Sequence, residues 1–202
     1  MEGYKGFYKT ENNLVVRDNF SQLRAIDEIY FLDDETPIKY GGNTSYYDSG
    51  HGFHFADSIS KTMPYFRTAI TSGDYVVAKI ETFGEVDKSI DEEGCYAARG
   101  YKINKILNHN DIIDFIYNSI DSIESVRILG QYTSMMSDEE KAKTMNLYHS
   151  LIKEYSTDFE QRWIDIYCLY EGIMYLNSEF KFEYFNADNK KEYIKKLIIE
   201  KH

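Results

Sequence analysis

The residue pattern of this 202-residue chain changes once, near residue 108. Up to residue 107, glycines separate short runs of β-branched and aromatic residues, which is typical of strands. From Asn110 onward, apolar residues recur three and four positions apart, as they do on one face of a helix. The change predicts an α+β fold in two parts. A mixed β-sheet domain with short helices is expected over residues 1–108, and a mainly helical domain that packs on the sheet over residues 109–202.

The first part contains one segment that is especially typical of a strand. Residues 75–83 are mostly β-branched and aromatic and precede Gly84, where we expect the strand to end. A helical turn or two is predicted over residues 20–29. A short helix is predicted from Asp57, and Pro64 should interrupt or restart it because proline lacks a backbone N–H. Shorter strands are predicted over residues 4–8, 13–17, 52–55 and 97–107.

The second part carries cap signals ahead of its helices. Asn110 is predicted to cap a first helix, since its side chain can accept a hydrogen bond from a free backbone N–H. Ser137 with Glu140, and Thr157 with Glu160, have the spacing of capping boxes. The predicted buried face of the first helix consists of Ile112, Ile113, Ile116, Tyr117 and Ile120. The remaining predictions are a core helix containing Trp163, a strand over residues 180–184 and an amphipathic helix over residues 189–201.

The net charge of the chain disfavours nucleic acids as binding partners and favours basic protein surfaces. Its 34 acidic and 23 basic residues give a net charge of −11, which repels the phosphates of DNA and RNA. Direct binding of nucleic acid is therefore not expected. An acidic surface with many of the nineteen tyrosines could instead suit a basic groove on another protein. The alternative is that the charge serves solubility, that the tyrosines are core residues, and that Asp33-Asp34-Glu35 and Asp91-Glu92-Glu93 are solvated loops.

Several kinds of site are absent from the sequence. No run approaches the roughly 18 apolar residues of a membrane span, and the first residues contain no apolar signal core, so we expect no membrane insertion and a cytoplasmic location. Cys95 and Cys168 form neither a disulfide framework nor a zinc motif. His51 and His54 have a His-x-x-His spacing, but positions three apart on a strand point to opposite faces, so no metal site is predicted. The chain contains no glycine-rich phosphate cradle and no Gly-x-Ser-x-Gly elbow.

Four blocks of the first part occur in a familiar order: residues 3–7, Gly52-Phe53-His54-Phe55-Ala56-Asp57, residues 75–86 and residues 102–107. Together they resemble an uncharacterised family of small phage and bacterial domains that carry a Gly-Phe-His-Phe strand, and the resemblance covers residues 3–107. Ala56 stands where that family has a cysteine, residues 9–50 form a longer insertion, and the second half is helical instead of repetitive. The resemblance implies a phage or mobile-element context.

A second resemblance is to small ADP-ribosyltransferase-like domains. It is carried by Tyr4-Lys5-Gly6-Phe7, residues 51–55 and Tyr65-Phe66. The resemblance implies that NAD is the cofactor and that Tyr4, Gly6, His54 and Tyr65 line its cleft. Lys5 stands where these domains have the histidine that holds the nicotinamide ribose. The candidate carboxylates are Glu81, Glu85, Glu92 and Glu93, and their spacing marks none of them as catalytic.

These observations leave two functional hypotheses open. In the first, the chain is a small acidic phage or mobile-element protein that acts without a cofactor. It binds another protein and inhibits a nucleic-acid-binding host protein, such as a defence protein, by acidic mimicry. In the second, it is an NAD-dependent ADP-ribosyltransferase or an NAD-binding domain.

Overall fold

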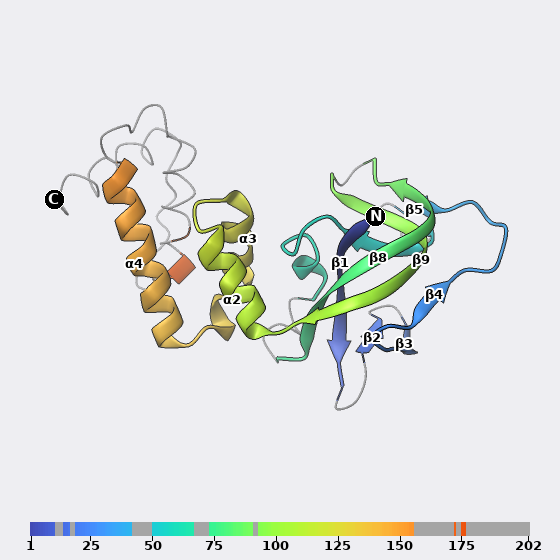
Figure 1. Cartoon of the computed structure of the whole chain (residues 1–202), viewed down its shortest axis with the longest axis horizontal. Coiled ribbons are helices and arrows are strands. Elements are labelled where there is room, and N and C mark those ends of the chain that lie inside the picture. Colours follow the sequence, from blue (N-terminus) through green and yellow to red (C-terminus); the bar gives the residue numbers. More distant parts are fainter. Residues whose placement is uncertain are drawn as a thin grey trace. The chain divides into compact units, whose positions relative to one another are not determined.

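A computed structural model of the chain describes residues 1–10, 14–16, 19–41, 50–66, 73–90, 93–155, 172, 175 and 176. The fold is α+β, with antiparallel strands in the first part and helices in the second (Figure 1). The chain divides into two compact units, residues 1–111 and residues 112–202. The sequence analysis placed this division between residues 108 and 109.

A long hairpin of two strands dominates the first unit. β8 (Tyr75–Lys88) pairs with β9 (Cys95–Leu107) over most of its length. The predicted end of β8 at Gly84 is wrong, because Gly84 lies at a bulge between Phe83 and Val86 and the strand continues beyond it. Gly84 has a φ of 72°, which glycine adopts without the steric cost that a Cβ would impose.

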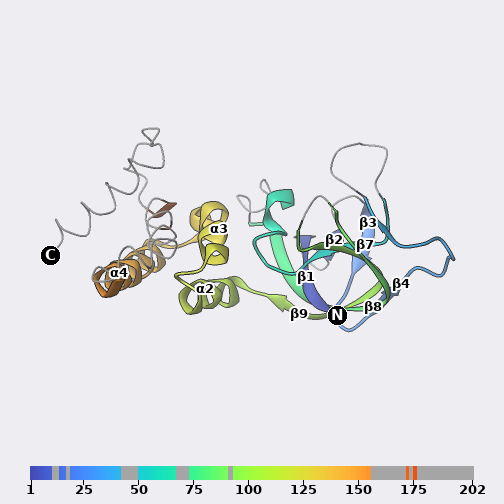
Figure 2. The ribbon, with the colours of Figure 1, turned by 90° about the horizontal axis from the view of Figure 1, so that it is seen from above.

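Two further strands close this hairpin into a ring. β1 (Glu2–Lys9) runs antiparallel to the first half of β8, and β7 (Phe53–Ala56) runs antiparallel to the first residues of β9. β1 and β7 meet where Tyr4 pairs with Ala56. β1, β7, β9 and β8 therefore form a small barrel-like ring of strands (Figure 2).

Three strands extend this sheet at its two ends: β2 (Leu14–Val16) pairs with β1, β3 (Asn19–Arg24) pairs with β2, and β4 (Ile29–Phe31) pairs with β9. A separate two-stranded sheet consists of β5 (Lys39–Tyr40) and β6 (Gly50–His51). The helix predicted over residues 20–29 is wrong. Its residues form β3 and a turn into β4, because pairing with β2 and β9 outweighs the local helical spacing.

The helix predicted from Asp57 does not begin at that residue, although a short helical element is present at Pro64, where a restart was predicted. Residues 57–62 form bends and turns, and the 3₁₀ helix η1 (Met63–Phe66) follows them, with Pro64 at its second position. Proline is tolerated in a first turn because the N–H it lacks has no partner there.

Apolar side chains from every strand of the ring fill its interior. Tyr101 and Phe7 are fully buried there. Residues on one face of a regular strand alternate with those on the other, so the interior takes residues two apart, such as Ala78 and Ile80 of β8 or Tyr101 and Ile103 of β9. The buried cluster consists of Phe7, Leu14, Phe55, Ala78, Ile80, Ala98, Tyr101 and Ile103.

The helical elements described from residue 109 to 155 are α2 (His109–Asn118), α3 (Ile123–Tyr132), the 3₁₀ helix η2 (Thr133–Met135) and α4 (Asp138–Tyr155). The predicted capping box ahead of α4 is confirmed: Ser137 N–H donates to Glu140 Oε2 at 2.7 Å, and Glu140 N–H donates to Ser137 Oγ at 3.3 Å. The cap of α2 is Asn108 and not Asn110, since Asp111 N–H donates to Asn108 Oδ1 at 3.0 Å. Of the predicted face of α2, Ile112, Ile113, Ile116 and Ile120 are buried and Tyr117 is half-buried.

Helix α3 was not predicted from the sequence. Its cap is Ser122, whose Oγ accepts a hydrogen bond from Ser125 N–H at 3.1 Å. Val126, Ile128 and Leu129 form its buried face. The described helices contain none that is long and apolar enough to cross a membrane. The predictions at Thr157, Glu160, Trp163, Cys168, residues 180–184 and residues 189–201 lie outside the described residues.

Candidate functional site

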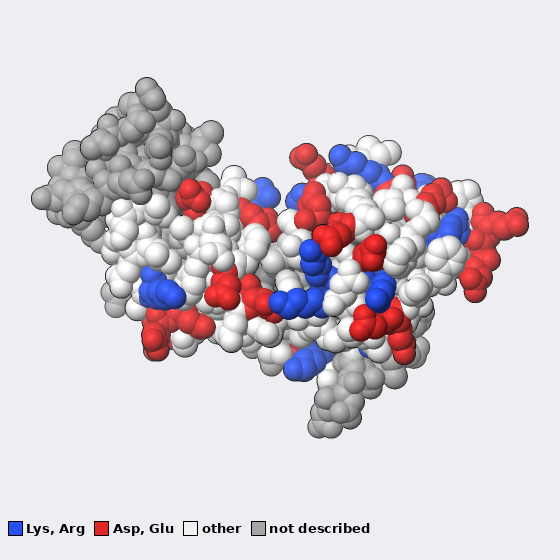
Figure 3. Space-filling model, in the orientation of Figure 1, with Lys and Arg blue, Asp and Glu red and all other residues white. Residues whose placement is uncertain are grey.

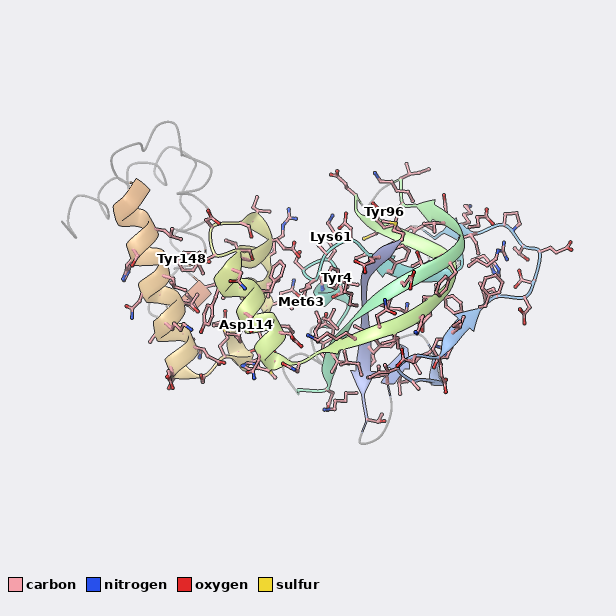
Figure 4. All side chains as sticks on the ribbon, in the orientation of Figure 1. Tyr4, Lys61, Met63, Tyr96, Asp114 and Tyr148 are labelled. Carbon is pink, nitrogen blue, oxygen red and sulfur yellow. The ribbon has the colours of Figure 1, made fainter. Side chains whose placement is uncertain are left out.

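Three of the four residues predicted to hold NAD lie on neighbouring strands. Tyr4, labelled in Figure 4, pairs with Ala56, and His54 is two positions from Ala56 on the same strand. Since residues two apart on a strand share a face, Tyr4, Gly6 and His54 belong to one face of the sheet. Gly6 is buried, and the Tyr40 ring stacks on the His54 imidazole with ring centroids 4.7 Å apart. The side chain of Tyr65 lies outside the described residues, so the cleft remains a prediction.

Lys5 belongs to the opposite face, which lines the ring of strands. Its ammonium group donates a hydrogen bond to the backbone carbonyl of His54. The same group lies 5.6 Å from the centroid of the Tyr101 ring and 6.0 Å from that of Phe7, within the range of a cation–π contact. The Lys5 ammonium therefore lies against the aromatic side chains of the interior and is held there by its hydrogen bond to β7.

A second cation contacts the same aromatic group. Arg24 Nε donates to Tyr101 Oη at 2.8 Å, and its guanidinium lies 4.4 Å from the centroid of the Tyr30 ring. Tyr30 Oη donates to Glu28 Oε2 at 2.8 Å. Burial raises the pKa of Tyr101 to about 12, so this hydroxyl stays protonated and is not a base near neutral pH. These contacts hold the turn between β3 and β4 against the core.

The described candidate carboxylates, Glu81, Glu85 and Glu93, do not converge. Glu81 and Glu93 are exposed at separate places on the β8–β9 hairpin, and Glu92 lies outside the described residues. Glu85 Oε2 accepts hydrogen bonds from Arg99 Nη2 at 2.9 Å and from Ile38 N–H at 3.3 Å. The hydrogen bond from Arg99 and the one from Ile38 lower the pKa of Glu85, so the carboxylate is ionised at neutral pH.

Arg99 and Glu85 together fasten the loop between β4 and β5. Arg99 donates to the carbonyl of Asp34 at 2.7 Å and to that of Thr36 at 2.8 Å, in addition to the Glu85 carboxylate. His51 Nε2 lies 2.9 Å from Asp34 Oδ1 and ties the same loop to β6. This arrangement accounts for Glu85 as a structural anchor.

The two histidines of the His-x-x-His spacing have different neighbours. His51 contacts Asp34 on the loop, whereas His54 stacks on Tyr40. Within the described part of the chain, no three histidine, cysteine or carboxylate side chains gather as a metal ion would require.

The loop that His51 and Arg99 hold belongs to a surface with both apolar and acidic character. Ile26, Ile29 and Phe31 are 47%, 65% and 48% exposed. From Ala25 to Ile38 the chain has no basic residue and five acidic ones. We call this the β4 surface, and its members are Ile26, Asp27, Glu28, Ile29, Phe31, Asp33, Asp34 and Glu35.

Figure 3 shows acidic side chains grouped at the right-hand end of the molecule, where the loop after β4 lies in Figure 1. The sequence left Asp33-Asp34-Glu35 open as a solvated loop or as part of an acidic binding surface, and it did not predict the exposure of Ile29 and Phe31. Their alternation with the half-buried Tyr30 is the only local signal, and three residues are too few for it to stand out.

Comparisons of the chain with protein-family models, with curated proteins and with solved structures found no match. Both family resemblances therefore remain predictions.

Proposed function

We propose that this protein binds another protein without catalysis, and that its β4 surface engages a basic groove on the partner. The observation that carries the proposal is the exposure of Ile29 and Phe31 among five carboxylates with no basic residue between Ala25 and Ile38. Exposed apolar side chains with a polar rim are typical of binding surfaces. The carboxylates add charge complementarity, which speeds the encounter with a basic partner and disfavours an acidic one.

The structure of the loop supports this use of the surface. Arg99 holds the carbonyls of Asp34 and Thr36, so the acidic segment has a defined conformation before any partner binds. A preorganised surface loses less conformational entropy on binding than a loop that must first be ordered.

The proposal extends to the consequence of binding. Basic grooves in nucleic-acid-binding proteins attract phosphates, and an acidic protein seated in such a groove competes with the nucleic acid. Inhibition of a host defence protein, in the phage or mobile-element context of the first resemblance, is part of this proposal.

The experiment begins with capture of partners from a prokaryotic lysate and measures association rates on the purified partner. The variant Asp33→Lys/Glu35→Lys reverses charge on the β4 surface. The control Asp114→Lys/Glu139→Lys makes the same change in net charge on exposed residues of α2 and α4; Asp114 is labelled in Figure 4. Asp34 is left unchanged because it contacts His51.

We expect the β4 variant to slow association about tenfold or more at low salt, and the control about twofold or less. The difference should shrink at 0.15 M salt, where the Debye length is about 8 Å. Equal rates for the two variants, or a wild-type rate independent of salt, would overturn the proposal.

The second hypothesis, NAD binding, is favoured by one observation: Tyr4, Gly6 and His54 share a face of the sheet. If they bind NAD, the nucleotide at millimolar concentration should raise the melting temperature of the whole protein by mass action. The variant His54→Ala should reduce this rise, while Asp114→Asn should leave it unchanged. No rise in the melting temperature with the wild-type protein excludes the NAD hypothesis.

A further inference from the structure

Strand β4 has one edge against β9 and one edge away from it. Its register with β9 is Tyr30 opposite Tyr101 and Phe31 opposite Gly100. Leu32 N–H donates to the carbonyl of Arg99 at 3.0 Å, which continues the same register. In an antiparallel pair, residues that exchange hydrogen bonds alternate with residues that do not.

This alternation determines where the backbone of Ile29 and Phe31 points. Because Leu32 bonds to β9, so does Tyr30 two positions earlier, and the N–H and C=O groups of Ile29 and Phe31 point away from β9. Among the described strands, β4 ends the order of the sheet and none pairs with that outer edge. The same two residues carry the exposed apolar side chains of the β4 surface.

The strand is held rigidly although it is short. The Tyr30 ring packs on the buried Tyr101 with centroids 5.2 Å apart, and Tyr30 Oη accepts a hydrogen bond from Ala25 N–H. The Phe31 ring lies over Gly100, where a Cβ would come within 2.5 Å of it. The outer edge is thus a fixed row of hydrogen-bonding groups, which is the arrangement that accepts an added strand.

The carboxylates beside β4 determine which kind of strand can pair with its outer edge. A second copy of this chain would bring its own Glu28, Asp33 and Glu35 against the same residues, and like charges facing each other across a strand pair are unfavourable. A lysine- or arginine-rich segment would meet opposite charges instead, while β-branched side chains at alternate positions would contact Ile29 and Phe31.

From this geometry we propose that β4 accepts an extended basic segment of the partner protein as an additional strand. This inference rests on the proposed function and specifies its mode. Main-chain hydrogen bonds to Ile29 and Phe31 supply the pairing, and the carboxylates of the β4 surface supply the preference for a basic sequence.

The test uses a peptide of alternating lysine and valine as the probe and two variants at one position. Phe31→Pro removes the outward N–H, and proline is tolerated at the solvent-facing positions of edge strands. Phe31→Ala removes the same ring but keeps the N–H. Circular dichroism and unfolding curves of both full-length variants verify that they fold.

We expect the wild-type protein to bind the peptide and to protect the amides of Ile29 and Phe31 from hydrogen exchange. Phe31→Pro should bind about three- to tenfold more weakly than Phe31→Ala, which is the effect of one lost hydrogen bond. A peptide N-methylated at its valines should bind more weakly than the unmodified peptide. Equal affinities for the two variants, or for the two peptides, overturn strand addition.

The Asp33→Lys/Glu35→Lys variant separates this inference from the proposed function. If the reversal weakens binding of the purified partner while Phe31→Pro and Phe31→Ala bind the peptide equally, strand addition fails and the acidic binding surface stands. If the reversal has no effect on the partner, the proposed function fails as well.

Discussion

The strand-rich unit and the helical unit are stabilised by contacts that span different distances along the chain. In the helices, the caps Asn108, Ser122 and Ser137 each bond to a residue three positions ahead. In the ring of strands, Tyr4 pairs with Ala56, and Arg99 bonds to the carbonyl of Asp34. The helices can therefore be predicted from short windows of sequence, whereas the ring requires segments that are remote in sequence to meet.

The largest expected loss of stability comes from replacing a fully buried tyrosine by alanine in either unit. Tyr101 in the first unit and Tyr148 in the second are both fully buried, so each substitution by alanine should lower the free energy of unfolding by about 3–5 kcal/mol. If the units are stabilised separately, hydrogen exchange should accelerate mainly in the unit that carries the change. Exchange that accelerates equally over residues 1–111 and 112–155 in both variants would show one shared core instead.

A smaller effect is expected from the long-range contacts of Arg99. Arg99→Ala should cost about 1–2 kcal/mol, because the carbonyls of Asp34 and Thr36 lose a charged donor. Hydrogen exchange should then accelerate in residues 32–40 and not in α2, and Asn104→Ala, at an exposed position of the same strand, serves as the control. Protection of residues 32–40 that survives Arg99→Ala would contradict this role.

The pH dependence of the same loop follows from Glu85. Its pKa is lowered in the folded protein, so its contribution to stability is fully present above its ordinary value of 4.5. That contribution is lost as the pH falls through the lowered folded value. Exchange of residues 32–40 should accelerate over this acidic range in the wild type, and Glu85→Gln should show the faster exchange already at pH 6.

Loss of a helix-cap hydrogen bond should lower the free energy of unfolding by about 1 kcal/mol. Ser137→Ala and Asn108→Ala each remove a cap side chain and should lower stability by about 1 kcal/mol. Ser137→Asp, which can still accept from the backbone, should lose less. Chemical unfolding curves measure all three, and a loss above about 3 kcal/mol for either alanine variant would mean that the residue does more than cap its helix.

The smallest effect is expected from the buried tyrosines at alkaline pH. Burial raises the pKa of Tyr101 and of Tyr132 to about 12, against 10 in the unfolded chain. Stability is therefore complete below pH 10 and declines as the pH rises towards 12, by less than about 1 kcal/mol for each tyrosine at pH 10.5. Tyr101→Phe and Tyr132→Phe should each remove one late step from the absorbance titration at 295 nm, and two unchanged titrations would contradict these pKa values.

The candidate site was predictable only in part. The acidic triplet Asp33-Asp34-Glu35 is visible in the sequence, but nothing near it indicates that Arg99 holds its backbone. The pairing of β4 with β9 exposes Ile29 and Phe31, and no local pattern in three residues predicts that pairing. Tyr4 and His54 were grouped by a family resemblance, and the register of β1 with β7 puts them on one face.

The sequence by itself determined the α+β division, the strands at residues 75–83 and 97–107, and the capping box at Ser137, because these signals involve residues within a few positions of one another. Only the tertiary structure decided that β8 continues past Gly84 and that residues 20–29 form strand and turn instead of helix. It also decided that β4 lies at the end of the sheet. The physical reason is that a strand obtains its hydrogen bonds from a neighbour distant in the chain, whereas a helix obtains them from residues four positions away.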